Sequence, residues 1–369
     1  MNQLFRWDQM GLFLLALAAG ILPFAVPEVC AAALREGLTL CSGPLLLSLF
    51  PFLVVSRLLI QCPESDLLAL PFRLAAWGIG IRTPCAARVL CIGFLGGFAP
   101  AASAAAQAVR TGQLTAEEAD ALLPACICSG PSFVVLTVGQ SLLGSAELGV
   151  LLFASQITAN YLTAALLNRF AGVRSVKLGS AAPASPAPPR LDEILADAAI
   201  TYCKLCGFIL FFRMLAAGAG ALLPAGAGTL CSILLEVCSG CDLASRTGRW
   251  GSLLCCAALS VQGLSVLLQV RTICPPEMTL RPLYRARMLH LPLSLALFYL
   301  LLPGGEADVF STLPARILLM RRVPPDCALL VFVVCCMAAC TLRSGIRQVE
   351  QKQMARNAGG CCINSKTLL

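Results

Sequence analysis

The sequence is divided into a series of long apolar segments that alternate with short polar connections. Most of these segments are about 16 to 25 residues long, the length at which an α-helix crosses roughly 30 Å of hydrocarbon. Only 12% of the residues are charged, whereas an ordinary soluble domain has about 25%. Because lipid offers backbone amides no hydrogen-bond partner, the apolar segments must be helical or lie in breaks lined by protein. The chain is therefore predicted to be an all-α, polytopic helical membrane protein whose partner is the lipid bilayer.

We expect about eight spans, together with two re-entrant or half helices that enter and leave the membrane on one side. The predicted spans are 10–26, 38–60, 117–140, 146–170, 198–223, 250–271, 288–303 and 326–342. The predicted re-entrant segments are 84–108 and 228–246.

A linker rich in proline and alanine divides the chain into two halves. Proline removes hydrogen-bond donors and favours extended chain, and the basic residues on both sides of the linker place it in the cytoplasm. The predicted organisation is an N-terminal signal-anchor helix (1–30), a first membrane half (31–171), the cytoplasmic linker (172–190), a second membrane half (191–303), a loop with the last membrane helix (304–345) and a basic tail (346–369). We therefore expect a multi-pass protein of the cell membrane with both termini in the cytoplasm.

The two halves carry similar elements in the same order. Arg110-Thr-Gly and Arg246-Thr-Gly each follow a short apolar piece, and each precedes an apolar helix that is interrupted by glycine. With the linker inside, the re-entrant piece of the first half would dip in from the cytoplasm and that of the second half from outside. Such an inverted two-fold repeat with broken helices is typical of secondary transporters, whose ligand site lies near the middle of the membrane.

Ser129-Gly130-Pro131 interrupts the apolar helix of the first half. Pro131 has no amide hydrogen and pushes against the preceding turn, so carbonyls near Ile127 lose their helical partners. At membrane depth, the released carbonyls must meet water, other parts of the protein or a ligand. The alternative is a kink that only improves helix packing.

Polar residues interrupt the matching helix of the second half. Gln262, Ser265 and Gln269 are spaced i, i+3 and i+7, so we expect them to share one helix face. Ser260 and Gly263 belong to the same polar segment. Such a face either lines a polar cavity or forms hydrogen bonds with a neighbouring helix, and the sequence leaves both alternatives open.

Glu236 is a carboxylate inside an apolar segment, with no basic residue within a helical turn. An acid within the membrane is costly, which indicates a functional site. It could bind a cation or a proton, or accept hydrogen bonds from a ligand; the alternative is an interfacial or helix-capping carboxylate. The candidate solute-binding residues are Ser129, Gly130, Pro131, Glu236, Ser239, Gly240, Ser260, Gln262, Gly263, Ser265 and Gln269.

The sequence carries no pattern that is typical of an enzyme. We find no nucleophile–base pair, phosphate-binding loop or metal-ligating cluster, and so expect no catalysis, no cofactor and no metal. The net charge of +8 is distributed over helix ends and the tail as topology signals are, so no nucleic-acid partner is expected. His290, the only histidine, is predicted to be an interfacial anchor. Thr115-Ala-Glu-Glu118 predicts a capping box whose acids, with Asp120, face solvent.

Several segments together follow one family pattern. They are Gly97-Phe-Ala-Pro100, Arg110–Ala119, Cys126–Pro131, Leu235–Gly240, Leu259–Val266 with Gln269, and Tyr284–His290. With these motifs the chain resembles, over nearly its whole length, the sporulation integral membrane protein YlbJ family, whose members carry two nucleoside-recognition (Gate) domains. Polar residues that the family pattern places at three positions are replaced here by Ile127, Cys128 and Leu267, and its Gly-Tyr-Pro-x-Gly segment is altered to Gly97-Phe-Ala-Pro-Ala.

The resemblance implies a role in endospore formation in a Gram-positive bacterium and kinship with nucleoside transporters. It also implies other sporulation membrane proteins as partners, in the forespore or mother-cell membrane. Two function hypotheses follow. The first is a sporulation-associated membrane protein that binds or transports a small solute between its two halves. The second is a non-transporting scaffold needed for assembly of the spore cortex or envelope.

Overall fold

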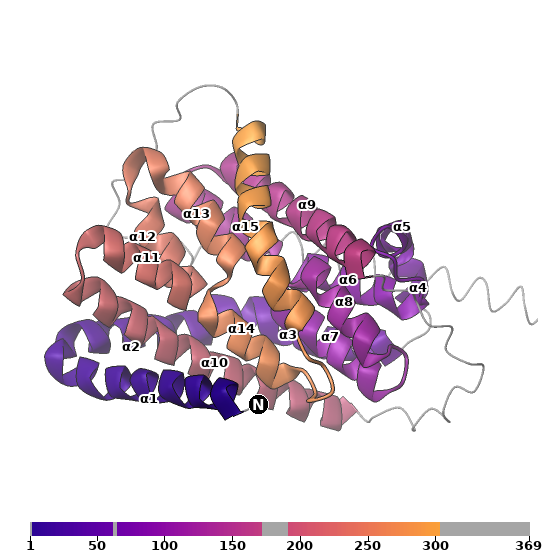
Figure 1. Cartoon of the computed structure of the whole chain (residues 1–369), viewed down its shortest axis with the longest axis horizontal. Coiled ribbons are helices and arrows are strands. Elements are labelled where there is room, and N and C mark those ends of the chain that lie inside the picture. The colour runs from indigo at the N-terminus through magenta and orange to yellow at the C-terminus, as the bar shows by residue number, and fades with distance from the viewer. Residues whose placement is uncertain (1, 62–64, 172–190, 303–369) are drawn as a thin grey trace, which may run out of the picture.

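The computed structural model describes residues 2–61, 65–171 and 191–302, and within these ranges every regular element is a helix (Figure 1). Before the linker lie α1 (Asn2–Ala25), α2 (Pro27–Ser42), α3 (Pro44–Gln61), α4 (Ser65–Leu68), α5 (Leu70–Gly78), α6 (Pro84–Gly96), α7 (Phe98–Arg110), α8 (Ala116–Cys126), the π-helix η1 (Ser132–Leu142) and α9 (Ala146–Ala171). After it lie α10 (Leu191–Leu222), α11 (Ala225–Leu235), α12 (Val237–Ser245), the 3-10 helix η2 (Gly248–Trp250), α13 (Gly251–Val261), α14 (Gly263–Ile273) and α15 (Arg281–Leu301). The prediction of an all-helical chain is confirmed for these residues.

Several helical stretches can cross a membrane by their length and composition. They are Pro27–Leu47, Ala146–Ala171, Leu191–Leu222 and Gly248–Ile273. Large apolar side chains stand exposed on α9 and α10, among them Leu162, Phe170 and Ile200, as expected where lipid replaces water as the solvent. The eight-span count stays a prediction, and the linker 172–190, the region 304–345 with span 326–342, and the tail 346–369 lie outside the described residues.

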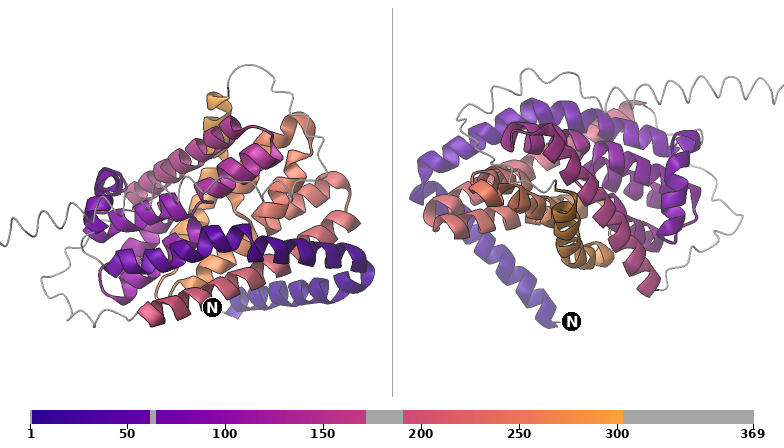
Figure 2. Two further views of the ribbon diagram at one scale, coloured as in Figure 1. Left: turned by 180° about the vertical axis from the view of Figure 1, so that it is seen from behind. Right: turned by 90° about the horizontal axis from the view of Figure 1, so that it is seen from above.

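The segment predicted as one span at 38–60 is divided in the structure. α2 ends at Ser42 and α3 begins at Pro44, with Gly43 between them. Pro44 has no amide hydrogen to donate and disfavours helical backbone in the residue before it, which explains the break. Helical hydrogen bonds continue across this junction, from Gly43 N to Thr39 O and from Leu47 N to Gly43 O, so the stretch Pro27–Leu47 is still long enough to cross a membrane. α1, α2, α3 and α10 pack together along one side of the molecule (Figures 1 and 2).

Two helical hairpins correspond to the segments predicted to be re-entrant. α6 and α7 pack against each other, and a Cβ on Gly93 would lie 3.2 Å from Cβ of Ala101. Gly97 alone forms the tip, with φ +80° and ψ −164°, a conformation essentially confined to glycine. α11 and α12 form the second hairpin around Glu236, and a Cβ on Gly240 would lie 2.8 Å from Cα of Ile233. Each hairpin returns the chain toward the side from which it came.

An interrupted helix follows each hairpin, as the sequence predicts. α8 ends at Cys126, Ile127 is extended, and η1 begins after Pro131. In the second half, α13 and α14 follow one another through the molecule (Figure 1), separated by Gln262 with φ +65°. The predicted breaks at Ser129–Pro131 and beside Gly263 are therefore confirmed.

The matched Arg-Thr-Gly tripeptides form similar turns in both halves. The hydroxyl of Thr111 donates to Gln107 O at 2.9 Å, and that of Thr247 donates to Ala244 O at 2.7 Å. The glycine that follows each threonine has positive φ, 68° and 64° respectively. Both halves thus contain a hairpin, a capped turn and an interrupted helix in the same order.

The start of α8 is capped as predicted, but two of its three acids are buried. Thr115 Oγ1 accepts from the Glu118 amide at 3.1 Å, and the Thr115 amide donates to Glu118 at 3.2 Å. The expectation of solvated acids is confirmed for Glu117, which is exposed, and is wrong for Glu118 and Asp120, which are 2% and 6% exposed. Glu118 accepts from Thr83 at 2.6 Å, and Asp120 accepts from the Thr279 amide at 2.8 Å. Loops before α6 and α15 cover these carboxylates and provide the donors that water would otherwise supply.

We predict that Gly97→Ala destabilises the protein more than Gly144→Ala. Both glycines have positive φ, +80° and +73°, but a Cβ on Gly97 would lie 2.7 Å from the Gly130 amide nitrogen, whereas a Cβ on Gly144 meets nothing within 4 Å. We expect a loss of about 1 kcal/mol at Gly144 from backbone strain alone, and about 2 kcal/mol more at Gly97 from the clash and from its glycine-only backbone conformation. Unfolding titrations of both variants in detergent micelles measure the difference. Equal losses would contradict the close approach of hairpin tip and helix break.

Candidate functional site

The tip of each hairpin lies against the break of the interrupted helix in its own half. Gly97 lies against Gly130, since a Cβ on Gly97 would lie 2.7 Å from the Gly130 amide nitrogen. In the second half, a Cβ on Gly263 would lie 3.0 Å from the amide nitrogen of Glu236. The two halves meet at these breaks, because Gln262 Nε2 donates to Ser129 Oγ at 3.4 Å. Four discontinuities that are far apart in the sequence are thereby brought into one region.

Glu236 lies at the N-terminus of α12, where its carboxylate caps the helix. Its oxygens accept from the amides of Cys238 at 2.8 Å and Ser239 at 2.7 Å. The side chain is 2% exposed, and the positive end of the helix dipole stabilises its negative charge. These hydrogen bonds agree with the second interpretation of the sequence, in which Glu236 caps a helix. Capping also explains how an acid without a neighbouring basic residue in the sequence can be buried.

A cavity of about 60 Å³ adjoins this capped acid. Ser129 and Gly130 from the first half line it, together with Glu236 and Gln269 from the second half. Its apolar wall includes Leu45, Leu49, Phe98 and Ile209. A largely apolar space of this size, with polar groups on one part of its wall, holds a few waters or the polar group of a small solute. The cavity brings together four of the predicted solute-binding residues.

Two buried amide oxygens beside the breaks have no hydrogen-bond partner within the described part of the chain. Gln269 Nε2 donates to Ser265 Oγ at 2.9 Å, and Gln262 Nε2 donates to Leu259 O at 2.7 Å, but Oε1 of each glutamine is unpaired. A buried acceptor without a donor costs about 1–3 kcal/mol. A ligand carrying hydroxyl or amine donors would remove this cost at Gln269, which lines the cavity.

Ser265 and Gln269 share a face of α14 as expected, but this face does not continue into α13, because the left-handed backbone at Gln262 ends that helix and reorients the chain. Ser260, on the other side of this break, does not line the cavity. Its hydroxyl donates to Cys256 O at 2.7 Å and accepts from Gln156 Nε2 at 3.0 Å. It also forms a hydrogen bond with Ser294. Ser260 thus joins α13 to α9 and α15, which is the helix-contact alternative.

The remaining candidates shape the site without lining the cavity. Gly263 and Gly240 allow close backbone contacts beside Glu236 and within its hairpin. Ser239 supplies an amide to the carboxylate, and Ser265 accepts from Gln269. Pro131 precedes η1 as its N-cap residue.

Sequence reasoning missed Arg287, which is 7% exposed on α15. Its guanidinium donates to Ile127 O at 2.7 Å and to Ser260 O at 3.3 Å. The carbonyl near Ile127, predicted to lose its helical partner, is therefore bound by this arginine. Both carbonyls lie where a helix ends, and the negative end of a helix dipole attracts a cation. Arg287, His290 and Ser294 are spaced i, i+3 and i+7, so they share one face of α15. This spacing was the sequence signal that could have revealed a polar face on the helix.

His290 lies on the same face of α15 and is not an interfacial anchor. It is 1% exposed, and its Nε2 lies 3.2 Å from Gln156 O. The prediction of interfacial anchoring is wrong, because α15 packs this face against α9 and α13. Asn160 on α9 adds a further donor to Ile127 O, at 3.4 Å.

Comparisons with known proteins give no relative for this chain. No family model, no curated protein and no solved structure matches it. Within the described ranges, no group of three or more histidine, cysteine, aspartate or glutamate residues is placed to hold a metal ion.

We predict that Arg287→Gln lowers the free energy of unfolding by about 2 kcal/mol or more, because it leaves the carbonyls of Ile127 and Ser260 with fewer donors. Arg285→Gln is the matched control, since Arg285 is exposed on the same helix, and a surface substitution changes stability by about 0.5 kcal/mol or less. Unfolding titrations in micelles compare the two variants. If both were equally stable, Arg287 would not hold the two helix ends.

Proposed function

We propose that the chain is a multi-pass membrane protein that binds or transports a small polar solute at the cavity between its two halves. One observation supports this most directly. The breaks of both halves meet there, and each contributes polar groups, Ser129 with Gly130 and Glu236 with Gln269. Irregular backbone at membrane depth is tolerated where it is buried in protein or lines a cavity. Discontinuous helices of transporters are a recurrent case, with the solute bound at the breaks.

The chemistry of the cavity favours a solute with hydrogen-bond donors. The carboxylate of Glu236 and the unpaired oxygen of Gln269 are acceptors, and the hydroxyl of Ser129 can accept as well. Hydroxyl and amine groups of a polyol, an amino compound or a nucleoside satisfy such acceptors. The apolar wall, which includes Phe98, would pack against the remainder of the molecule.

Transport would use the inverted relation of the two halves that the sequence predicts. Each hairpin contacts the break of an interrupted helix through a residue at its tip, Gly97 or Glu236. Movement of a hairpin away from that break would open the cavity to one side of the membrane. The resemblance of the motifs to the YlbJ family adds the setting to this proposal, namely the cell membrane of an endospore-forming bacterium.

A non-transporting scaffold is the second candidate, and one observation favours it. The buried polar groups of Ser260, Gln156 and Ser294 are bonded to one another and to neighbouring backbone. Hydrogen bonds of this kind hold membrane helices together without any solute. A scaffold would need only this cluster, whereas a solute-binding protein also needs the cavity at Glu236.

We predict that Glu236→Gln and Gln269→Leu each lower solute uptake by the full-length protein in lipid vesicles. Removing a charged hydrogen-bond partner costs about 1.5–3 kcal/mol, so we expect uptake to fall at least about 10-fold. The probes are radiolabelled nucleosides, amino acids and polyols. Ser155→Ala is the control, because Ser155 is buried but bonded within its own helix, and we expect it to leave uptake unchanged.

The unfolding midpoint of each purified variant separates loss of binding from loss of fold. Glutamine at position 236 keeps one oxygen as a helix cap, so we expect a stability loss of about 1 kcal/mol. Gln269→Leu leaves that cap intact. If no probe entered vesicles above the level of empty ones, and none raised the midpoint of the wild-type protein, the scaffold hypothesis would replace the solute-binding one.

A further inference from the structure

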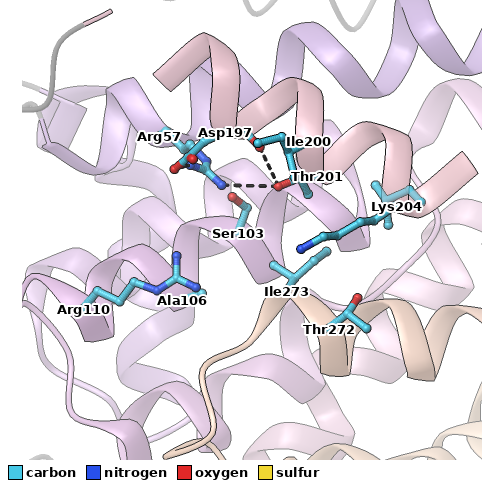
Figure 3. A pocket seen from close by; sticks show the side chains of 11 residues that line it. Arg57, Ser103, Ala106, Arg110, Asp197, Ile200, Thr201, Lys204, Thr272 and Ile273 are labelled. Carbon is cyan, nitrogen blue, oxygen red and sulfur yellow. Dashed lines mark hydrogen bonds and ion pairs between the residues drawn. The ribbon is translucent and has the colours of Figure 1, made fainter. Parts of the chain in front are cut away.

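A second cavity, of about 170 Å³, lies between α3, α7, α10 and α14 (Figure 3). It is separate from the cavity at Glu236, with which it shares no lining residue. Its polar wall is rich in basic side chains and hydroxyls, of which the Thr201 and Thr272 hydroxyls already donate to Asp197 O and Gln269 O, each at 2.8 Å. Three basic side chains and three hydroxyls line it, namely Arg57, Arg110, Lys204, Ser103, Thr201 and Thr272.

The positive charges in this cavity outnumber the negative ones. Asp197 is the single acid in its lining, and it is already paired with Arg57, which also donates to Thr201 at 3.4 Å. Within residues 2–61, 65–171 and 191–302, neither Arg110 nor Lys204 has an ion-pair partner. Figure 3 shows the amine of Lys204 extending from α10 into the space that Arg110 faces from α7. Two positive charges therefore remain uncompensated in one concave site.

We infer from the length of α10 that the cavity lies near one edge of the bilayer. α10 has 32 residues and is therefore about 48 Å long, whereas the hydrocarbon layer is about 30 Å thick. Asp197 and Lys204 lie in the first half of this helix, while Arg110 and Thr272 lie at or near the last turns of α7 and α14. Phospholipid headgroups and soluble anions can both reach this level. The sequence places it on the cytoplasmic side, next to the linker.

We propose that this cavity binds a phosphate group, presented by an anionic phospholipid headgroup or by a small soluble phosphate. Phosphate oxygens only accept hydrogen bonds, and arginine, lysine and hydroxyl groups donate to them. A tetrahedral phosphate accepts from several directions, which suits donors that come from three helices, Arg57 on α3, Arg110 and Ser103 on α7, and Lys204 on α10. The cavity volume of about 170 Å³ holds a phosphate with a small substituent. Basic pockets between membrane helices on the cytoplasmic side bind lipid headgroups in this way.

The test titrates the full-length protein in detergent micelles with two probes. One is inorganic phosphate, compared with sodium chloride at equal ionic strength. The other is phosphatidylglycerol, compared with phosphatidylcholine, and bound lipid is counted by native mass spectrometry. Saturable binding of phosphatidylglycerol alone identifies a lipid headgroup site. Saturable binding of phosphate, with a rise in the unfolding midpoint, identifies a site for soluble phosphate.

Paired variants locate the binding. Arg110→Gln combined with Lys204→Gln removes two charged donor groups. We expect it to lower the affinity for whichever probe saturates at least about 10-fold. Arg35→Gln combined with Arg169→Gln removes equal charge from exposed positions outside the cavity and should leave the affinity within about two-fold. Asp197→Asn removes the acid and releases Arg57, so it should tighten binding about two- to five-fold.

The gain expected from Asp197→Asn keeps the test decisive if the double variant folds poorly. The proposal is overturned if neither probe saturates on the wild-type protein. It is also overturned if the cavity double variant (Arg110→Gln, Lys204→Gln) weakens binding no more than the control double variant (Arg35→Gln, Arg169→Gln). A third contradicting result would be that Asp197→Asn fails to strengthen binding.

Discussion

Backbone groups released by a helix break must be satisfied inside the protein, because lipid supplies no partner. Arg287 does this for both interrupted helices at once, by donating to carbonyls of Ile127 and Ser260. A buried guanidinium is costly when isolated, but here it lies between two helix ends whose dipoles are negative toward it. One side chain of α15 therefore serves the breaks of both halves, and Asn160 of α9 adds a second donor at Ile127 O. The rest of the site is built around the backbone that it holds.

Glu236 and Arg287 follow the same electrostatic rule with opposite signs. The carboxylate accepts from amides at the start of α12, and the guanidinium donates to carbonyls at the ends of α8 and α13. Each charge is thus stabilised by helix ends, and neither needs an ion-pair partner in the described part of the chain. The cavity adjoins the acid, and a packed polar cluster around Ser260 adjoins the arginine. This division separates a space that can take a solute from contacts that hold helices together.

Much of the fold could be predicted because its signals are local. Pro131 and Gly263 indicated the two breaks, apolar segment lengths indicated hairpins and helices, and Thr115 indicated a capping box. The errors concern partners that are distant in the sequence. Asp120 binds the chain 159 residues away at Thr279, and His290 lies against Gln156, 134 residues away. No local pattern carries such pairings, because they form only when helices pack.

The sequence by itself determined that the chain is helical, that its apolar helices suit a membrane, and where two of these helices are broken. Proline, glycine and apolar length act through backbone sterics and solvation of each segment alone, so their effects can be read along the chain. Only the tertiary structure decided which groups meet at the breaks. It separated Ser260 from Gln269, placed Arg287 on the released carbonyls, and brought Ser129 and Glu236 to one cavity. These outcomes depend on how helices cross in space, since a buried polar group takes whichever partner the packing brings within hydrogen-bond distance.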